Sequence, residues 1–104
     1  MEARAKKIAK ELKKRIKSKY QLQEMRIFGS VARGEQGKDS DIDIFVHLAH
    51  SDRNVEEYLY DTSYDIELEY DCLIDLFIID DKGMKGKVGS APIFKNILSE
   101  GASV

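Results

Sequence analysis

Residues 28–46 read FGSVARGEQGKDSDIDIFV, and this stretch decides how the rest of the chain is interpreted. A glycine and a small hydroxyl residue, Gly29 and Ser30, follow a short apolar run, and Asp41 and Asp43 open a second run after ten further residues. The runs 25–28 and 41–48 are rich in apolar, β-branched and aromatic side chains, which predicts two strands. Residues 29–40 contain three glycines, which predicts a loop between them.

The flanking sequence predicts three helices and a third strand. Apolar residues recur at three- and four-residue spacing in residues 1–19, in residues 52–69 and after Pro92, as expected of amphipathic helices. Residues 72–79 are apolar except for Asp75 and predict a strand, whereas the Gly- and Lys-rich residues 82–89 are expected to be mobile. This order predicts a single α/β (α+β) domain over residues 1–104, with a small mixed β-sheet flanked by helices.

Charge is distributed unevenly along the chain. Residues 1–26 carry ten Lys or Arg against three Asp or Glu, whereas residues 27–81 carry three against fifteen. An acidic centre argues against a general nucleic-acid coat protein, and the basic first helix is interpreted as a solvated face, so direct nucleic-acid binding is not expected. We find no signal peptide and no apolar run that could span a membrane. With Cys72 as its one cysteine, the chain is expected to be cytoplasmic.

Three carboxylates are the strongest candidates for chemistry. Asp41 and Asp43 stand two residues apart in a predicted strand, so their side chains project from the same face. Asp75 interrupts an otherwise apolar strand, where a carboxylate is costly to bury unless it is paired or binds a metal. If the two strands are neighbours, the three groups converge, and their oxygens suit Mg²⁺ or Mn²⁺. The alternative is that these are ordinary acids at strand ends and turns.

The combination of Gly-Ser, ten residues and Asp-x-Asp between apolar strands closely resembles the nucleotidyltransferase signature of the DNA polymerase β superfamily. The segments SVARG, SDID and PIFKNILSEG resemble the corresponding sequences of the minimal nucleotidyltransferases in that superfamily. The resemblance covers nearly the whole chain and implies a polymerase-β palm-like fold.

The resemblance also implies a role for each motif residue. Gly29 and Ser30 would hold the triphosphate of a nucleotide, and Arg33 would contact phosphate or brace the loop. Asp41 and Asp43 would bind two Mg²⁺ ions, with Mn²⁺ as a substitute. Asp75 would bind the catalytic ion and help to deprotonate the acceptor hydroxyl.

The expected function is Mg²⁺-dependent nucleotidyl transfer, with ATP as the substrate. Small proteins of this type resemble the antitoxin of HEPN–MNT toxin–antitoxin pairs, which implies AMP transfer to a tyrosine of a HEPN toxin and a hetero-oligomer with it. One alternative is a non-catalytic antitoxin or binding module that neutralises its partner by contact. A less favoured alternative is transfer to a small molecule, for which we see no acceptor-binding domain.

Overall fold

The computed structural model describes residues 3–29, 41–86 and 91–104. They form a four-stranded mixed sheet in the order β3-β2-β1-β4, so the predicted fold class is confirmed. Strand β1 (Leu22–Phe28) pairs antiparallel with β2 (Ile42–Leu48) and with the short β4 (Ala102–Ser103). Strand β3 (Ile74–Asp80) pairs parallel with β2.

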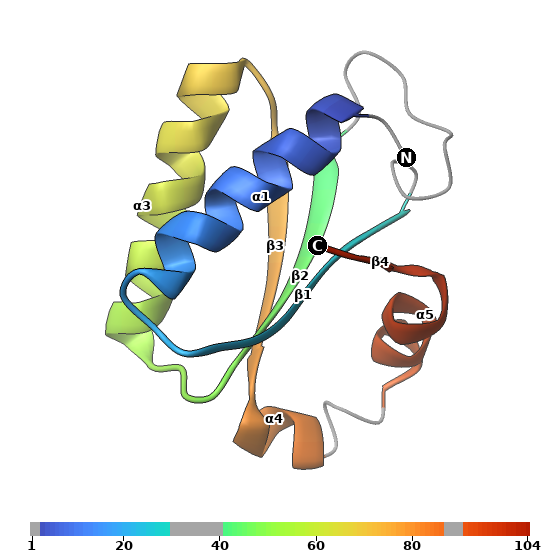
Figure 1. Cartoon of the computed structure of the whole chain (residues 1–104). Helices are drawn as coiled ribbons and strands as arrows, with labels where there is room; N and C mark the ends of the chain where they lie inside the picture. Colours follow the sequence, from blue (N-terminus) through green and yellow to red (C-terminus); the bar gives the residue numbers. More distant parts are fainter. Residues whose placement is uncertain (1–2, 30–40, 87–90) are drawn as a thin grey trace.

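Two long helices cover one face of the sheet (Figure 1). Helix α1 (Ala3–Lys17) lies against β1, and α3 (Arg53–Tyr70) lies against β3. Their apolar stripes pack on alternate residues of the strands, because successive strand side chains point to opposite faces. The cluster includes the buried apolar residues of both helices: Ala5, Ile8, Ala9, Leu12, Ile16, Val55, Leu59 and Ile66.

The opposite face carries a smaller apolar cluster beneath α5 (Pro92–Glu100). Phe45 of β2 is fully buried there and meets Phe94 edge-on, with ring centroids 5.8 Å apart. Ile79 and Ile97 complete its buried part. Its buried strand residues, Phe45 and Ile79, lie two residues beyond Asp43 and four residues beyond Asp75 on the same face.

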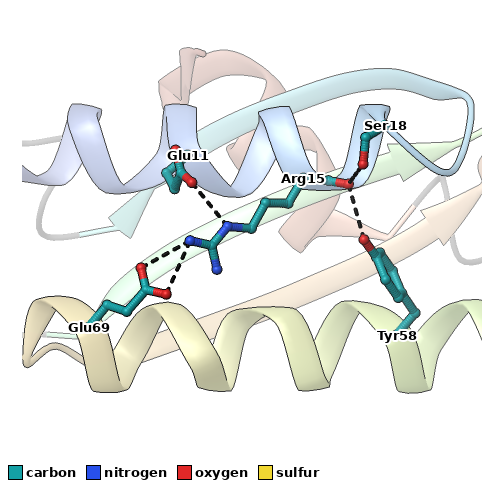
Figure 2. A network of polar contacts seen from close by, with 5 residues as sticks. All are labelled: Glu11, Arg15, Ser18, Tyr58 and Glu69. Carbon is teal, nitrogen blue, oxygen red and sulfur yellow. Dashed lines mark hydrogen bonds and ion pairs between the residues drawn. The ribbon is translucent and has the colours of Figure 1, made fainter.

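A polar network fastens α1 to α3 (Figure 2). Arg15 donates to Glu11, one turn earlier, at 3.0 Å and to Glu69 of α3 at 2.9 Å. The Tyr58 hydroxyl donates to the carbonyl oxygen of Arg15 at 3.2 Å. The basic first helix thus uses one of its cations to hold the acidic helix beside it.

The expectation that residues 82–89 are mobile is wrong for the first part of that segment. Helix α4 (Asp81–Lys85) begins directly after β3. Asp80 accepts a hydrogen bond from the Gly83 amide at 2.8 Å and so caps the helix. Residues 87–90 lie outside the described part of the chain. None of the described helices is long and apolar enough to cross a membrane.

Candidate functional site

Asp43 and Asp75 lie side by side on neighbouring strands. The parallel register of β2 and β3 places them directly opposite each other. Ile42 and Ile44, on either side of Asp43, pack against α1 and α3, so Asp43 points to the other face of the sheet. The two strands are therefore neighbours, as convergence of the carboxylates requires, and Asp43 and Asp75 lie on the face of the sheet that packs against α5.

Asp41 joins this pair from the residue before β2. The pKa of Asp75 is raised above its usual value, first because its carboxyl group is partly removed from water and then because it shares a hydrogen bond with Asp41. The charge of Asp41 acts in the same direction, whereas a hydrogen bond with Asp43 lowers the pKa. The three carboxyl groups thus form one interacting cluster, named here the carboxylate cluster (Asp41, Asp43, Asp75).

Glu67 is a positioning residue that the sequence did not reveal. Its carboxylate accepts a hydrogen bond from the Ile74 amide at 2.9 Å, at the first residue of β3 and immediately before Asp75. The negative charge of Glu67 also contributes to the raised pKa of Asp75. In the sequence, Glu67 is one of several acids on a helix, and no local pattern separates it from those that only face solvent.

Gly29 lies against the carboxylate cluster. It follows β1 directly and has a φ of 74°, a left-handed conformation that glycine adopts without strain. A Cβ atom at this position would lie 2.2 Å from Oδ2 of Asp43. Within the described residues, the glycine of the motif thus lets the backbone approach the carboxylate.

An aromatic pair borders the cluster. Phe28 stands opposite Asp43 in the β1–β2 ladder, and Phe77 is two residues beyond Asp75 on the same face of β3. Their rings meet edge-on with centroids 5.1 Å apart. Both side chains are half-buried. They provide an apolar boundary between the carboxylates and the packing beneath α5.

The other predicted site residues, Ser30 and Arg33, lie outside the described part of the chain. Across residues 3–29, 41–86 and 91–104, no three His, Cys, Asp or Glu side chains are already arranged to hold a metal ion. Asp75 instead shares hydrogen bonds with both neighbouring aspartates. Carboxylate oxygens are the ligands that Mg²⁺ and Mn²⁺ prefer in proteins. The donor set therefore suits Mg²⁺ or Mn²⁺.

Comparison with known proteins places this arrangement in a family. A family model described as "Nucleotidyltransferase domain" matches residues 9–98. A protein of Methanocaldococcus jannaschii named "Putative protein adenylyltransferase" is 44% identical over 55 residues, which are 52% of this chain and 55% of that protein. A second protein of that name from the same organism is 51% identical over 43 residues, or 41% of this chain and 50% of that protein. The matches thus span about half the length of these relatives.

Solved structures give the same fold at low sequence identity. The structure of a toxin–antitoxin with AMP-PNP matches with a TM-score of 0.62 at 21% identity, covering 89% of this chain and 69% of that one. A structure described as that of a "putative minimal nucleotidyltransferase" matches with a TM-score of 0.56 at 23% identity, covering 92% of this chain and 95% of that one. The chain belongs to the nucleotidyltransferase domain family, and its fold is that of the minimal members.

Proposed function

We propose that this member of the nucleotidyltransferase family transfers AMP from ATP to an acceptor hydroxyl. The observation that carries the proposal is the carboxylate cluster: Asp43 and Asp75 face each other across parallel strands, and Asp41 interacts with Asp75. Gly29, whose backbone approaches Asp43, adds a glycine turn of the kind that admits phosphate groups. The match of the family model across both motifs supports the same reaction.

In this reaction the acceptor oxygen attacks the α-phosphorus of ATP, a new P–O bond forms, and pyrophosphate leaves. Asp41 and Asp43 would hold two Mg²⁺ ions, and Asp75 would hold the catalytic one. The ions would supply positive charge to stabilise the attacking and the leaving oxygen. Asp75 helps to remove the proton of the acceptor hydroxyl. Gly29 and Ser30 hold the triphosphate. Arg33 contacts a phosphate or braces the loop.

The acceptor we propose is a tyrosine of a HEPN-type toxin, with which this chain forms a hetero-oligomer in the cytoplasm. Two observations support a protein acceptor and a toxin partner. Curated relatives carry the name protein adenylyltransferase, and a structural relative is a toxin–antitoxin crystallised with AMP-PNP. We assign specificity for the acceptor to the partner.

The test is to co-express the chain with the product of the neighbouring gene and to measure both cell survival and the mass of that product. We expect the toxin to gain the mass of AMP on a tyrosine, and cells to survive. Replacing Asp41 and Asp43 together by Asn should abolish both effects. The control is Asp61→Asn with Asp65→Asn, which makes the same change in charge at two exposed positions of α3.

The same experiment separates catalysis from neutralisation by contact. A contact inhibitor would still rescue the cells after Asp41→Asn with Asp43→Asn, and the toxin would stay unmodified throughout. Survival with the double variant would therefore overturn the catalytic proposal in favour of a binding module.

A further inference from the structure

The outer face of α1 carries exposed positive charge that the fold does not neutralise. Among the residues exposed on this helix are the lysines Lys6, Lys7, Lys10, Lys14 and Lys17. At 100° per residue they occupy an arc of about 100° on the side of the helix opposite its buried stripe. From Lys6 to Lys17 this basic face, as we call these five lysines, extends over about 16 Å of helix.

Among the described residues, the acidic helix α3 forms an ion pair with Arg15 and none with the lysines of the basic face. The ion pair between the two helices joins Arg15 to Glu69, and Glu11, the one acid on α1, turns to Arg15 as well (Figure 2). No ion pair joins the lysines of the basic face to any acid in the described residues. Within the described part of the chain, no acid neutralises these five lysines.

The basic face borders a shallow depression. The depression, of about 490 Å³ and open to solvent, lies over α1 and the end of α3. Its lining includes Lys6, Lys7, Lys10 and Lys14, together with Glu11 and with Tyr70 of α3. Four lysines and one acid thus border the same open surface. This excess of positive charge favours an anionic ligand.

The chemistry of the surface favours phosphate over an acidic protein. Protein interfaces have an apolar centre and are depleted in lysine. The large apolar side chains that are exposed in the described residues lie on α3, on α5 and on the segment between α3 and β3, with none on α1. Lysine binds phosphate as a compact, mobile point charge and needs no apolar neighbour. Lys6, Lys10 and Lys14 are each about 6 Å apart along the helix, a spacing that suits successive phosphates of one strand.

We propose that the basic face of α1 binds the phosphate backbone of a single-stranded nucleic acid. The site lies on the helical layer that covers the opposite face of the sheet from the carboxylate cluster, so it is independent of the proposed nucleotidyl transfer. It also revises our expectation that the chain makes no direct contact with nucleic acid. The binding is electrostatic and sequence-tolerant, and it weakens as salt rises.

The test is fluorescence anisotropy with a labelled single-stranded RNA of about 16 nucleotides, measured over a series of salt concentrations. The test variant is Lys6→Gln with Lys10→Gln and Lys14→Gln, which keeps good helix formers at exposed positions. The matched control is Lys82→Gln with Lys85→Gln and Lys95→Gln, three exposed lysines elsewhere with the same change in charge. Circular dichroism verifies that both variants fold.

We expect the test variant to bind at least about tenfold more weakly at low salt, and the control to bind within about twofold of the unaltered chain. The slope of log K against log salt should become less steep by about 2, since each phosphate contact on a single strand contributes about 0.7. Equal weakening in both variants, or no salt-dependent binding by the unaltered chain, would overturn the proposal. Polyglutamate that displaces the RNA at equal charge concentration would overturn it too, in favour of an acidic protein partner.

Discussion

Gly29 and Asp43 come so close that a Cβ atom on residue 29 would lie 2.2 Å from Oδ2 of the aspartate. The contact joins the residue after β1 to β2, which carries Asp43 and directly follows Asp41. Glycine is required at this position for two reasons: its φ is left-handed, and a side chain would collide with Asp43.

Gly29→Ala is therefore expected to damage both stability and activity. The left-handed conformation costs an alanine about 1 kcal/mol or more, and its methyl group must displace the Asp43 carboxylate. Urea unfolding should show the loss of stability, and nucleotidyl transfer should fall by tenfold or more, because small misplacements of reacting groups are costly. The control is Gly86→Ala, where a Cβ atom would meet its nearest neighbour at 3.6 Å and φ is −92°. If both variants behave alike, the close contact with Asp43 is not what constrains residue 29.

Asp75→Asn should stabilise the metal-free protein while it removes function. The pKa of Asp75 is raised by partial burial and then by Asp41, so ionisation of Asp75 costs folding free energy, and stability falls as pH rises through that pKa. Asparagine removes this cost, and solvent screening keeps the gain below about 1 kcal/mol. Without Mg²⁺, the Tm of the variant near neutral pH should be higher than that of the unaltered chain. Adding Mg²⁺ should raise the Tm of the variant by less than it raises the Tm of the unaltered chain. A lower Tm in the absence of metal would contradict the repulsion described here.

Because Asp80 caps α4 with a carboxylate, we expect the stability of the protein to fall at acidic pH. The pKa of Asp80 is lowered mainly by the hydrogen bond from the Gly83 amide, with a further hydrogen bond from the Ser51 amide. A lowered pKa in the folded state means that the stabilisation is present above about pH 4 and is lost as pH falls through the folded value. Asp80→Ala should cost about 1 kcal/mol at neutral pH.

Asp80→Asn is the matched control for that cap. Asparagine can accept the hydrogen bond from the Gly83 amide and is an equally good N-cap, and it does not titrate. Its amide nitrogen cannot accept the second hydrogen bond, from the Ser51 amide. Urea unfolding at a series of pH values should therefore show a stability between those of Asp80→Ala and the unaltered chain at neutral pH, and a smaller loss between about pH 4 and pH 2. If the free energy of unfolding of Asp80→Asn falls with pH as steeply as that of the unaltered chain, other carboxylates cause the loss of stability in acid.

The Arg15 network should contribute little to stability in spite of its many contacts. The side chains of Arg15 and Glu69 are 29% and 51% exposed, and pairs at such positions are worth less than about 1 kcal/mol. Arg15→Gln should lower the free energy of unfolding within that limit, and the difference should shrink at high salt. The comparison is Arg53→Gln, which breaks a more exposed pair with Glu57 and should change nothing measurable. If the free energy of unfolding of Arg15→Gln falls by several kcal/mol, the network is needed to hold α1 and α3 together, which would contradict this prediction.

The elements with strong local signals were predictable from the sequence. The helical stripe of α3 and the strand that follows Asp41 have the periodicity of buried amphipathic elements, and both are confirmed. Asp43 and Asp75 could be suspected of meeting because each is a charged residue in an apolar strand. Their pairing depends on β2 and β3 being parallel neighbours, which only the tertiary fold determines.

Features that depend on long-range contacts could not be predicted from the sequence. Strand β4 has two residues, Ala102 and Ser103, and exists because β1 offers an edge to pair with. Strand β1 begins at Leu22, three residues before its apolar run, since pairing with Leu48 extends it through polar residues. Glu67 supports β3 through a single hydrogen bond to Ile74, and no pattern along α3 distinguishes that carboxylate from its exposed neighbours.

The most direct test of the central claim is the rate of label transfer from α-³²P-ATP to the purified partner toxin in the presence of Mg²⁺. The carboxylate cluster predicts measurable transfer by the unaltered chain and by Asp61→Asn with Asp65→Asn. It predicts none by Asp41→Asn with Asp43→Asn, and none for any variant when the metal is chelated. Equal rates for the two double variants would contradict the claim that Asp41 and Asp43 form the catalytic centre.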